Sequence, residues 1–374
     1  MTGTHANAEH ADALTQRVLA RCDELGFALA GVATLQRSAW DAQLLSWLAA
    51  GKHASMDYLA RNTDLRLEPS RLLEGAARCV MVADVYHTRA DRDADTPAED
   101  EADAQPHGTI ARYARGDDYH EVMKRRLHTL ADELRAAHPG HECRAFVDTA
   151  PVLERELAQR AGLGWIGKHT LLIHPRVGSF LLLGGVMTTL PLVATAEPEP
   201  DHCGTCTRCI DACPTDAITP HSVDASRCIS YLTIEHRGPI DASLVGKLSG
   251  WIYGCDICQE VCPHNSPRPA GVDVGTRHAA YTPRHASLPL LEVLGWSEDD
   301  RRRIFKGSAM KRATLAMMKR NAVLLAADVL CATPNPPHTT SRQQLLDALR
   351  QVAVNETEDT LVRDAARETL QRVE

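Results

Sequence analysis

The 374-residue sequence lacks the features that would place it in a membrane or send it out of the cell. No uninterrupted apolar run reaches the roughly 18 residues that a membrane-spanning helix needs. Residues 1–10 are polar and contain neither a twin arginine nor an apolar signal core. We therefore expect a cytoplasmic protein that does not bind membranes, in which reduced cysteines are available as metal ligands.

Aromatic residues and, in one segment, acidic residues are also scarce. Aromatics make up only 4% of the chain, which argues against a nucleic-acid surface built from many stacking rings. Between residues 301 and 320 there are eight basic residues and no acidic one. The net charge is −8, but much of it comes from residues 88–107, an acidic stretch with little to bury that we expect to be a disordered loop. The basic segment is therefore a local positive patch on a mildly acidic protein.

Cysteine is abundant, and eight of the twelve cysteines follow the spacing of a bacterial-type ferredoxin. One run reads CxxCxxCxxxCP over residues 203–214, and a second reads CxxCxxxCP over residues 255–263. In such paired runs the cysteine before proline ligates the other cluster. The spacing, with Cys228 upstream of the second run, predicts two 4Fe–4S clusters, one held by Cys203, Cys206, Cys209 and Cys262 and the other by Cys213, Cys228, Cys255 and Cys258.

Structural zinc and disulfides are the alternatives for these cysteines. Zinc sites use paired CxxC units and have no use for a third cysteine at the same spacing. Disulfide frameworks belong to short secreted chains. The long gap between Cys228 and Cys255 indicates an insertion built around something else. The other cysteines are expected to be small buried hydrophobic residues: Cys22, Cys79, Cys143 and Cys331.

Three regions differ in their secondary-structure pattern. Residues 1–194 alternate helix and strand signals and predict an α/β layer structure, residues 195–270 are ferredoxin-like, and residues 285–374 are all-α and HEAT-like. In the first region we expect helices at 11–25, 119–137 and from Asp148-Thr149-Ala150-Pro151 to 160, strands at 28–34, 78–86 and 142–147, and a hairpin of 170–173 with 179–187. In the last we expect helices at 308–331, 341–354 and 357–373.

Several further motifs give the chain a resemblance to a known family over nearly its whole length. They are SMDYL at 55–59, ARYARGDDYH at 111–120, VDTAPVLER at 147–155, GWIGKHT at 164–170, GSAMKR at 307–312, RNA at 320–322 and the double cysteine run. In this order they resemble the epoxyqueuosine reductases. The resemblance implies a cobalamin- and iron–sulfur-dependent oxidoreductase that removes the epoxide oxygen of epoxyqueuosine in a tRNA anticodon.

The same resemblance implies a set of site residues. It makes Asp148 the proton donor and implies a cobalamin bound base-off, without a protein ligand on its lower face. Residues 229–235, inside the long cysteine gap, are expected to line the cobalamin pocket and bring a cluster beside it. The implied cobalamin contacts are Arg61, Asp148, Lys168, His169, Thr170, Leu172, Ser230 and Tyr231.

The residues alone leave the role of Asp148 open. A carboxylate between a strand and a helix either caps the helix or faces a ligand at the edge of the sheet. To donate a proton near neutral pH, Asp148 needs a pKa raised by burial under the corrin and the substrate, against the opposite effect of a helix N-terminus. The glycines of residues 162–170 similarly fit either an ordinary turn or a close approach of the backbone to a planar ligand.

The basic segment predicts an RNA contact. If residues 308–330 form one helix, basic residues two turns apart lie on one face, which suits the phosphates of an RNA stem. A merely solvated face is the alternative. The predicted RNA-binding residues are Lys311, Arg312, Lys319 and Arg320.

Two other functions are compatible with paired clusters. A reductive dehalogenase also combines cobalamin with two clusters, but the absent export signal and the basic segment argue against it. A plain ferredoxin-like electron carrier needs neither a cobalamin pocket nor the long region before the clusters. For the reductase we expect tRNA as substrate, an external electron donor such as flavodoxin or ferredoxin with its reductase, and a monomer.

Overall fold

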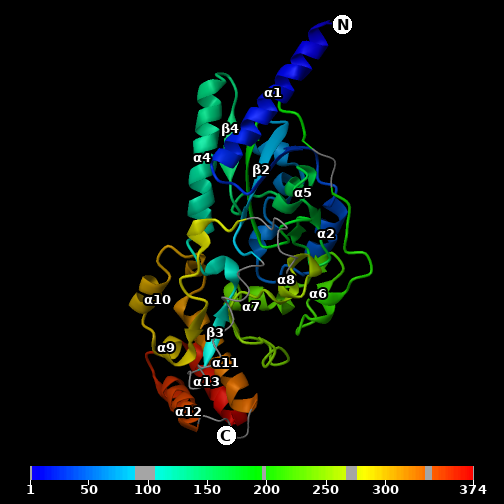
Figure 1. Ribbon diagram of the computed structural model, residues 1–374. Coiled ribbons are helices and arrows are strands. Elements are labelled where there is room, and N and C mark those ends of the chain that lie inside the picture. The colour runs from blue at the N-terminus through cyan, green and yellow to red at the C-terminus, as the bar shows by residue number, and fades with distance from the viewer. Residues whose placement is uncertain (1, 89–105, 196–198, 267–275, 333–338, 374) are drawn as a thin grey trace.

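The computed structural model describes residues 2–88, 106–195, 199–266, 276–332 and 339–373. The acidic stretch predicted to be a disordered loop lies, except for its ends, outside these residues. Figure 1 shows an elongated molecule, with the N-terminal helix α1 at one end, the C-terminal helices at the other and the cysteine-rich segments between them. No described helix is both long and apolar enough to cross a membrane.

A four-stranded sheet organises the N-terminal part. Its strands are β1 (Leu29–Thr34), β2 (Arg78–Val85), β7 (Leu181–Thr188) and β4 (Cys143–Phe146), in that spatial order. Every neighbouring pair is antiparallel. The predicted α/β layers are therefore present, but the rule that ligands bind at the carboxyl ends of parallel strands does not apply to this sheet.

Helices cover both faces of this sheet because its central strands are apolar on both sides. On β2, Val80 and Val82 pack under α1 (Thr2–Glu24) and α4 (Tyr119–Ala137). Their neighbours Cys79 and Met81 point the other way and pack with α5 (Glu154–Arg160). The alternation follows from the two-residue period of a strand.

Short elements complete this part of the fold. Helices α2 (Asp41–Ala49) and α3 (Thr63–Leu67) follow β1. Strand β6 (Leu172–Ile173) pairs with β5 (Trp165–Ile166), whereas β7 joins the main sheet. The predicted hairpin of 170–173 with 179–187 is thus wrong as a pair of strands, although one antiparallel bridge, His174 with Gly178, closes its turn.

The cysteine-rich region contains two short helices, α6 (Arg208–Asp211) and α8 (Ile257–Glu260), and the hairpin of β8 (Ile218–Thr219) with β9 (Ser222–Val223). The long gap between the cysteine runs holds α7 (Ile229–Ile234) and β10 (Trp251–Tyr253). In a second sheet, β10 runs parallel to β3 (His107–Ile110), and β11 (Ser287–Pro289) pairs antiparallel on the other side of β3.

The C-terminal third is mainly helical, with α9 (Leu290–Gly295), α10 (Glu298–Ile304), α11 (Leu315–Ala332), α12 (Thr339–Val354) and α13 (Thr360–Val373). The single helix expected at 308–331 is divided in two. A 3₁₀ turn, η9 (Ala309–Arg312), ends at Ala313, whose backbone is extended, and α11 starts after it. These helices share one hydrophobic core with α7, β3 and β10.

Candidate active site

Asp148 lies in a turn between β4 and α5, but it does not cap α5. The N-cap of that helix is Leu153, which has no side-chain cap, and the helix begins after Pro151 rather than around it. The backbone of Asp148 is left-handed, with φ 54°, a conformation that costs energy for a residue other than glycine. Its N–H donates to Glu154 Oε1 at 2.6 Å. The turn therefore leaves the carboxylate free for other contacts.

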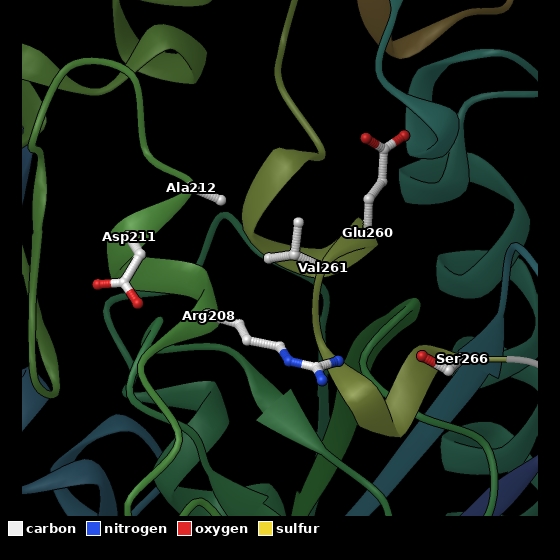
Figure 2. Close-up of a pocket in the computed structure, with 6 residues that line it drawn as sticks. All are labelled: Arg208, Asp211, Ala212, Glu260, Val261 and Ser266. Carbon is white, nitrogen blue, oxygen red and sulfur yellow. The ribbon is translucent and has the colours of Figure 1, made fainter.

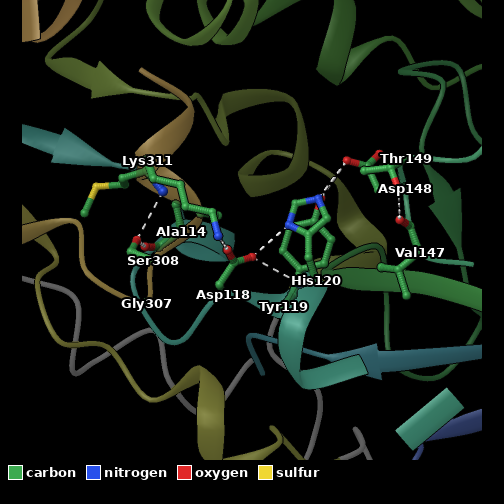
Figure 3. A network of polar contacts seen from close by, with 12 residues as sticks. Ala114, Asp118, Tyr119, His120, Val147, Asp148, Thr149, Gly307, Ser308 and Lys311 are labelled. Atoms are coloured by element: carbon green, nitrogen blue, oxygen red, sulfur yellow. Dashed lines mark hydrogen bonds and ion pairs between the residues drawn. The ribbon is translucent and has the colours of Figure 1, made fainter. Parts of the chain in front are cut away.

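Those contacts come from the start of α4 (Figure 3). His120 Nε2 lies 3.1 Å from Asp148 Oδ2, and the Tyr119 hydroxyl donates to the same oxygen at 3.0 Å. The other ring nitrogen, His120 Nδ1, lies 2.8 Å from Asp118 Oδ1. Asp118 Oδ2 in turn lies 2.6 Å from Lys311 Nζ. A continuous polar chain thus joins Lys311, Asp118, His120 and Asp148.

The electrostatics of this group differ from the expectation for Asp148. The hydrogen bond from His120 lowers the pKa of Asp148, against the effect of burial. Burial also opposes the charge on His120, but its bonds to Asp118 and Asp148 outweigh that effect and raise its pKa to about 9. Among the protein's own groups the shift of Asp148 is therefore downward, whereas the predicted rise in its pKa applies to burial under the corrin and the substrate and stays a prediction. In this arrangement the proton near neutral pH lies on His120, with Asp148 as its ionised partner.

A second proton lies close to Asp148. Burial, and after it the charge of Asp148, raise the pKa of Glu154 to about 8. The Asp148 side chain itself is 57% exposed and so remains accessible to a substrate. Burial, with a smaller contribution from the charge of Asp148, raises the pKa of Tyr58, which belongs to the SMDYL motif. The site therefore combines an exposed carboxylate with two groups that are protonated near neutral pH.

The predicted cluster ligands of the two cysteine runs lie close to one another. Burial, followed by the charges of Cys203, Cys209 and Cys206, raises the pKa of the Cys262 thiol to about 11. Burial and then Cys228 act most strongly on Cys258. Cys258 and Cys228 also act on Cys255, and Cys213 acts on both Cys258 and Cys228. These interactions show that the two cysteine runs lie close together. Cys209, which is predicted to belong to the other set, also acts on Cys258, so the division into two sets stays a prediction.

The arrangement also disfavours a single zinc ion. Zinc–sulfur bonds of about 2.3 Å require ligands that converge on one point. Among the described residues, no three His, Cys, Asp or Glu groups are close enough to hold one metal ion. A cubane is wider than a single ion and requires its thiols to be further apart, so the donor set fits two 4Fe–4S clusters.

The ARYARGDDYH motif connects the cluster region to the polar chain. The Arg112 backbone donates to Asp256, which lies between two cluster cysteines, and its guanidinium pairs with Asp256 at 3.2 Å and Glu260 at 2.5 Å. A few residues later, the same motif supplies Asp118 and His120. One segment therefore fixes both the second cysteine run and the polar chain at Asp148.

A shallow pocket lies between α6 and α8 (Figure 2). Its lining combines charged and small side chains and contains none of the predicted cofactor contacts. The lining residues are Arg208, Asp211, Ala212, Glu260, Val261 and Ser266.

His169 fits the role of a cofactor contact better than the other predicted residues of its motif. It is 3% exposed, and its Nδ1 accepts from the Leu171 backbone at 3.2 Å, so Nε2 carries the proton. Nε2 is buried and has no partner among the described residues. Burial and the charge of Arg155 lower the pKa of His169 to about 4, so the ring is neutral. An unpaired buried donor of this kind fits an amide or phosphate oxygen of a corrin side chain.

Several other predicted contacts already have partners within the protein. Lys168 Nζ donates to the carbonyls of Gly204 and Cys206, in the first cysteine run, at 2.6 and 3.0 Å. The Tyr231 hydroxyl lies 2.6 Å from Ser55 Oγ, which joins α7 to the SMDYL motif. Leu172 is 3% exposed in the core beneath α5. The side chains of these three residues therefore contact other parts of the protein and contribute to the site through that packing.

The remaining predicted contacts lie closer to solvent. Arg61 is exposed, and Ser230 is half-buried on α7. Thr170 is half-buried and adopts a left-handed backbone, with φ 70°, and its carbonyl accepts from Arg155 Nη1 at 3.0 Å.

The glycines of the GWIGKHT motif serve the fold itself. A Cβ on Gly164 would lie 2.1 Å from the carbonyl oxygen of Ile173, and one on Gly167 would lie 2.5 Å from the Ile173 side chain. These glycines therefore let the strand pair β5–β6 close on itself. The packing therefore favours an ordinary turn over the alternative, a close approach of the backbone to a planar ligand.

Two of the four predicted RNA-binding residues are buried, and that part of the prediction is wrong. Arg320 is 1% exposed and donates to the carbonyls of Leu232, His236 and Gly238 at 2.6 to 2.7 Å. Lys319 is 6% exposed and pairs with Glu358 of the α12–α13 turn at 2.5 Å. Because α11 packs on α7 and α13, the supposed basic face points into the protein.

The other two lie at the surface near the polar chain. Arg312 is half-exposed and forms two bonds with Glu235, at 2.7 and 2.8 Å, over the ring of Tyr58. Lys311 is 59% exposed and pairs with Asp118. The break at Ala313 places both residues on a different element from Lys319 and Arg320.

Sequence reasoning missed four residues of the candidate active site: Asp118, Tyr119, His120 and Glu154. Three of them are adjacent in the DDYH sequence, and the fourth lies in VDTAPVLER. The signal was present, because both motifs carry the resemblance. Neither motif indicates, however, that the start of α4 contacts the turn after β4.

Comparisons with known proteins agree with this architecture. A model described as "4Fe-4S double cluster binding domain" matches residues 202–265, and one described as "Epoxyqueuosine reductase QueG, DUF1730" matches residues 66–149. A curated epoxyqueuosine reductase of Burkholderia pseudomallei is 39% identical over 360 residues, 90% of this chain and 87% of that protein. One from Xanthomonas campestris is 40% identical over 351 residues, covering 91% of this chain and 96% of the relative.

Solved structures give the same result. A crystal structure of a selenomethionine-labelled epoxyqueuosine reductase superposes with a TM-score of 0.79 at 25% identity, covering 97% of this chain and 99% of the other. A second, of an epoxyqueuosine reductase with an epoxyqueuosine-modified tRNA stem loop, also has a TM-score of 0.79 at 25% identity, covering 96% and 99%.

Proposed function

The chain belongs to the epoxyqueuosine reductase family, and from this premise we propose that it reduces epoxyqueuosine to queuosine in a tRNA anticodon, with the proton supplied at Asp148. The observation that carries the proposal is the polar group around Asp148. An exposed carboxylate in contact with a protonated histidine and a tyrosine hydroxyl suits protonation of an oxygen that leaves carbon. The family relationship argues against the two alternative functions, a reductive dehalogenase and a plain ferredoxin-like electron carrier.

The overall reaction fixes what the protein must deliver. Removing an epoxide oxygen as water breaks two carbon–oxygen bonds and consumes two electrons and two protons. Bound cobalamin supplies the two-electron reducing chemistry, with electrons received from the clusters. The residues of this chain supply the protons: His120 passes its proton through Asp148 Oδ2 to the oxygen, and the Tyr119 hydroxyl holds that carboxylate in place. Glu154 lies next to them as a source of the second proton.

We assign the cluster ligands from the two groups of cysteines. One cluster is held by Cys203, Cys206, Cys209 and Cys262, and the other by Cys213, Cys228, Cys255 and Cys258. The charges that act on Cys262, from Cys203, Cys209 and Cys206, and those that act on Cys255, from Cys258 and Cys228, support this assignment. Trp165 lies against the first set, where its buried indole packs with Cys203 and Cys262.

The finer division of the chain follows from these sites. Residues 1–194 form the α/β part that binds cobalamin and substrate, residues 195–270 the part that binds the clusters, and residues 285–374 a HEAT-like helical part. For the cobalamin itself, the unpaired Nε2–H of His169 is the best supported contact, and we retain Thr170, Ser230 and Arg61 as further proposed contacts. Lys168, Leu172 and Tyr231 support the pocket through the contacts described above.

Arg312 remains the best candidate for an RNA contact. Its side chain is half-exposed, and its guanidinium lies over the ring of Tyr58. Burial, with a smaller contribution from the charge of Asp148, raises the pKa of the Tyr58 phenol. A phosphate near an anticodon loop that enters this site would therefore meet Arg312. We further propose that the protein acts in the cytoplasm as a monomer and accepts electrons from a flavodoxin or a ferredoxin.

The test is direct deoxygenation. The anaerobically reconstituted protein, with cobalamin and a chemical reductant, is incubated with a stem loop that carries epoxyqueuosine, and the nucleoside is followed by mass spectrometry. Loss of one oxygen to give queuosine is the expected result. An unchanged nucleoside together with dehalogenation of a halogenated phenol would overturn the proposal.

A further inference from the structure

Asp118 is a buried carboxylate held between two cations. It is only 2% exposed, yet Oδ1 lies 2.8 Å from His120 Nδ1 and Oδ2 lies 2.6 Å from Lys311 Nζ (Figure 3). Oδ1 also accepts from the His120 backbone at 3.2 Å, so that Asp118 is the N-cap of α4. A buried carboxylate without such partners would be costly.

Lys311 comes from a distant part of the chain, and its position is fixed. Ser308 Oγ donates to the Ala114 carbonyl at 3.2 Å, and the Asp118 N–H donates to the Gly307 carbonyl at 2.8 Å. Arg284 joins the same two segments, because its Nη2 donates to the carbonyls of Gly116 and Gly307, both at 2.9 Å. The GSAMKR and GDDYH motifs are thus two halves of one local structure.

We propose that Asp118 and Lys311 form a positioning pair that sets the orientation and the proton affinity of His120, and so the delivery of a proton at Asp148. This inference rests on the proposed function. It gives Lys311 a role inside the protein in place of the predicted RNA contact.

The orientation follows from the hydrogen bonds. With Nδ1 held by Asp118, the ring of His120 can turn only its Nε2 toward Asp148. Tyr119 stacks on the same ring, with centroids 4.0 Å apart, and restricts its rotation. A histidine oriented in this way by a carboxylate returns to the same geometry after each proton transfer.

The proton affinity follows from the charges that face His120. The carboxylates of Asp118, Asp148 and Glu154 favour its charged form, and Lys311, acting through Asp118, opposes them. Both cations lower the pKa of the Asp118 carboxyl against the effect of burial, so this carboxyl is ionised throughout the pH range in which His120 titrates. Loss of Asp118 and loss of Lys311 should therefore shift the pKa of His120 in opposite directions.

Variants separate this role from a purely structural one. Asp118→Asn keeps the size of the side chain but removes the negative charge, so the pKa of His120 should fall. Lys311→Met removes the opposing positive charge, so it should rise. Lys306→Met is the matched control, because Lys306 is exposed on the same segment, whereas it is the ammonium of Lys311 that pairs with Asp118. Lys311→Arg should restore the wild-type value.

The primary measurement is the pKa of His120 by NMR titration of the purified protein with its clusters oxidised. The second is the pH profile of turnover with the modified stem loop. In Asp118→Asn, kcat should fall about ten- to a hundredfold, typical of losing the carboxylate that orients a functional histidine, with KM for RNA unchanged. The alkaline limb of kcat should move to lower pH in Asp118→Asn and to higher pH in Lys311→Met.

Shifts of the same sign in both variants, or shifts as large in Lys306→Met, would overturn the proposed pair. So would a Lys311→Met protein that keeps the wild-type pKa of His120 but binds RNA more weakly, since Lys311 would then be an RNA contact. A wild-type protein that never deoxygenates the nucleoside would refute the proposed function, whereas the NMR titration would still decide the role of the pair.

Discussion

The cluster region, residues 202–265, and the basic segment, residues 301–320, were both interpreted from residue type and spacing, with opposite success. In the first, the spacing predicts a double-cluster domain, and a model described as a 4Fe-4S double cluster binding domain matches these residues. In the second, two of the four chosen cations are buried, and the helix meant to align them is broken at Ala313. A cluster imposes its geometry on a short stretch of chain, so local spacing carries the information. The partner of a basic residue is not encoded by neighbouring positions in the sequence. Whether such a residue is buried or exposed depends on how distant segments pack against it.

The largest expected effect tests the cluster side of this contrast. Cys203→Ser and Cys258→Ser should each remove one cluster and lower the iron content from about eight to about four per chain. Because the two cysteines belong to different sets, the EPR signals that remain should differ. Identical residual spectra would show that the cysteines are not divided as proposed.

The next effect separates the buried cation from the exposed one. Arg320→Met leaves three carbonyl groups at the end of α7 without a donor and should destabilise the protein by roughly 3–5 kcal/mol. Arg312→Met removes a half-exposed ion pair and should cost at most about 1 kcal/mol. Chemical denaturation of the two variants measures the difference. Equal losses of stability would contradict the contrast between the two arginines.

A smaller effect concerns catalysis. Asp148→Asn keeps the shape of the side chain but cannot pass on a proton, so turnover should fall about a hundredfold or more. Cobalamin binding, followed by its visible spectrum, should remain. In the unchanged protein, turnover should decline as the pH rises through about 9, where His120 loses its proton. Near-normal turnover of the variant at neutral pH would remove Asp148 from the mechanism.

The smallest effect decides whether any part of the basic segment meets RNA. Arg312→Gln should weaken binding of the tRNA stem loop about fivefold, taking roughly 1 kcal/mol for one charged contact. The dependence of affinity on salt should become shallower by about one unit. Lys306→Gln is the control for the lost charge alone. If both variants bind equally well at every salt concentration, the segment is only solvated.

Elements with a strong local pattern were predictable from the sequence. The helix expected at 119–137 has those bounds, because Asp118 caps it and its apolar residues recur at helical spacing. The strand expected at 78–86 forms the centre of the sheet. The failures depend on long-range packing. Strand β6 pairs with β5 because Gly164 allows the two to close together, and no local pattern distinguishes that pairing from the expected hairpin.

The candidate site was predictable in the same uneven way. Asp148 came from a resemblance, since its residue type and position fit a helix cap equally well. His120 and Asp118 could not be connected to Asp148 from the sequence, because the contact joins the start of α4 to a turn 28 residues later. The proton affinities of His120 and Asp148 within the protein depend on that contact and could therefore not be predicted from the sequence.

The buried Arg320 also has a consequence for the order in which this protein is made. A chain leaves the ribosome from its N-terminus, and Cys228 emerges at the start of α7 well before Arg320. The carbonyls at the far end of α7 gain their donors only when α11 has been synthesised and packed. The end of α7 and the turn that follows it are therefore completed late, after almost the whole chain has been translated.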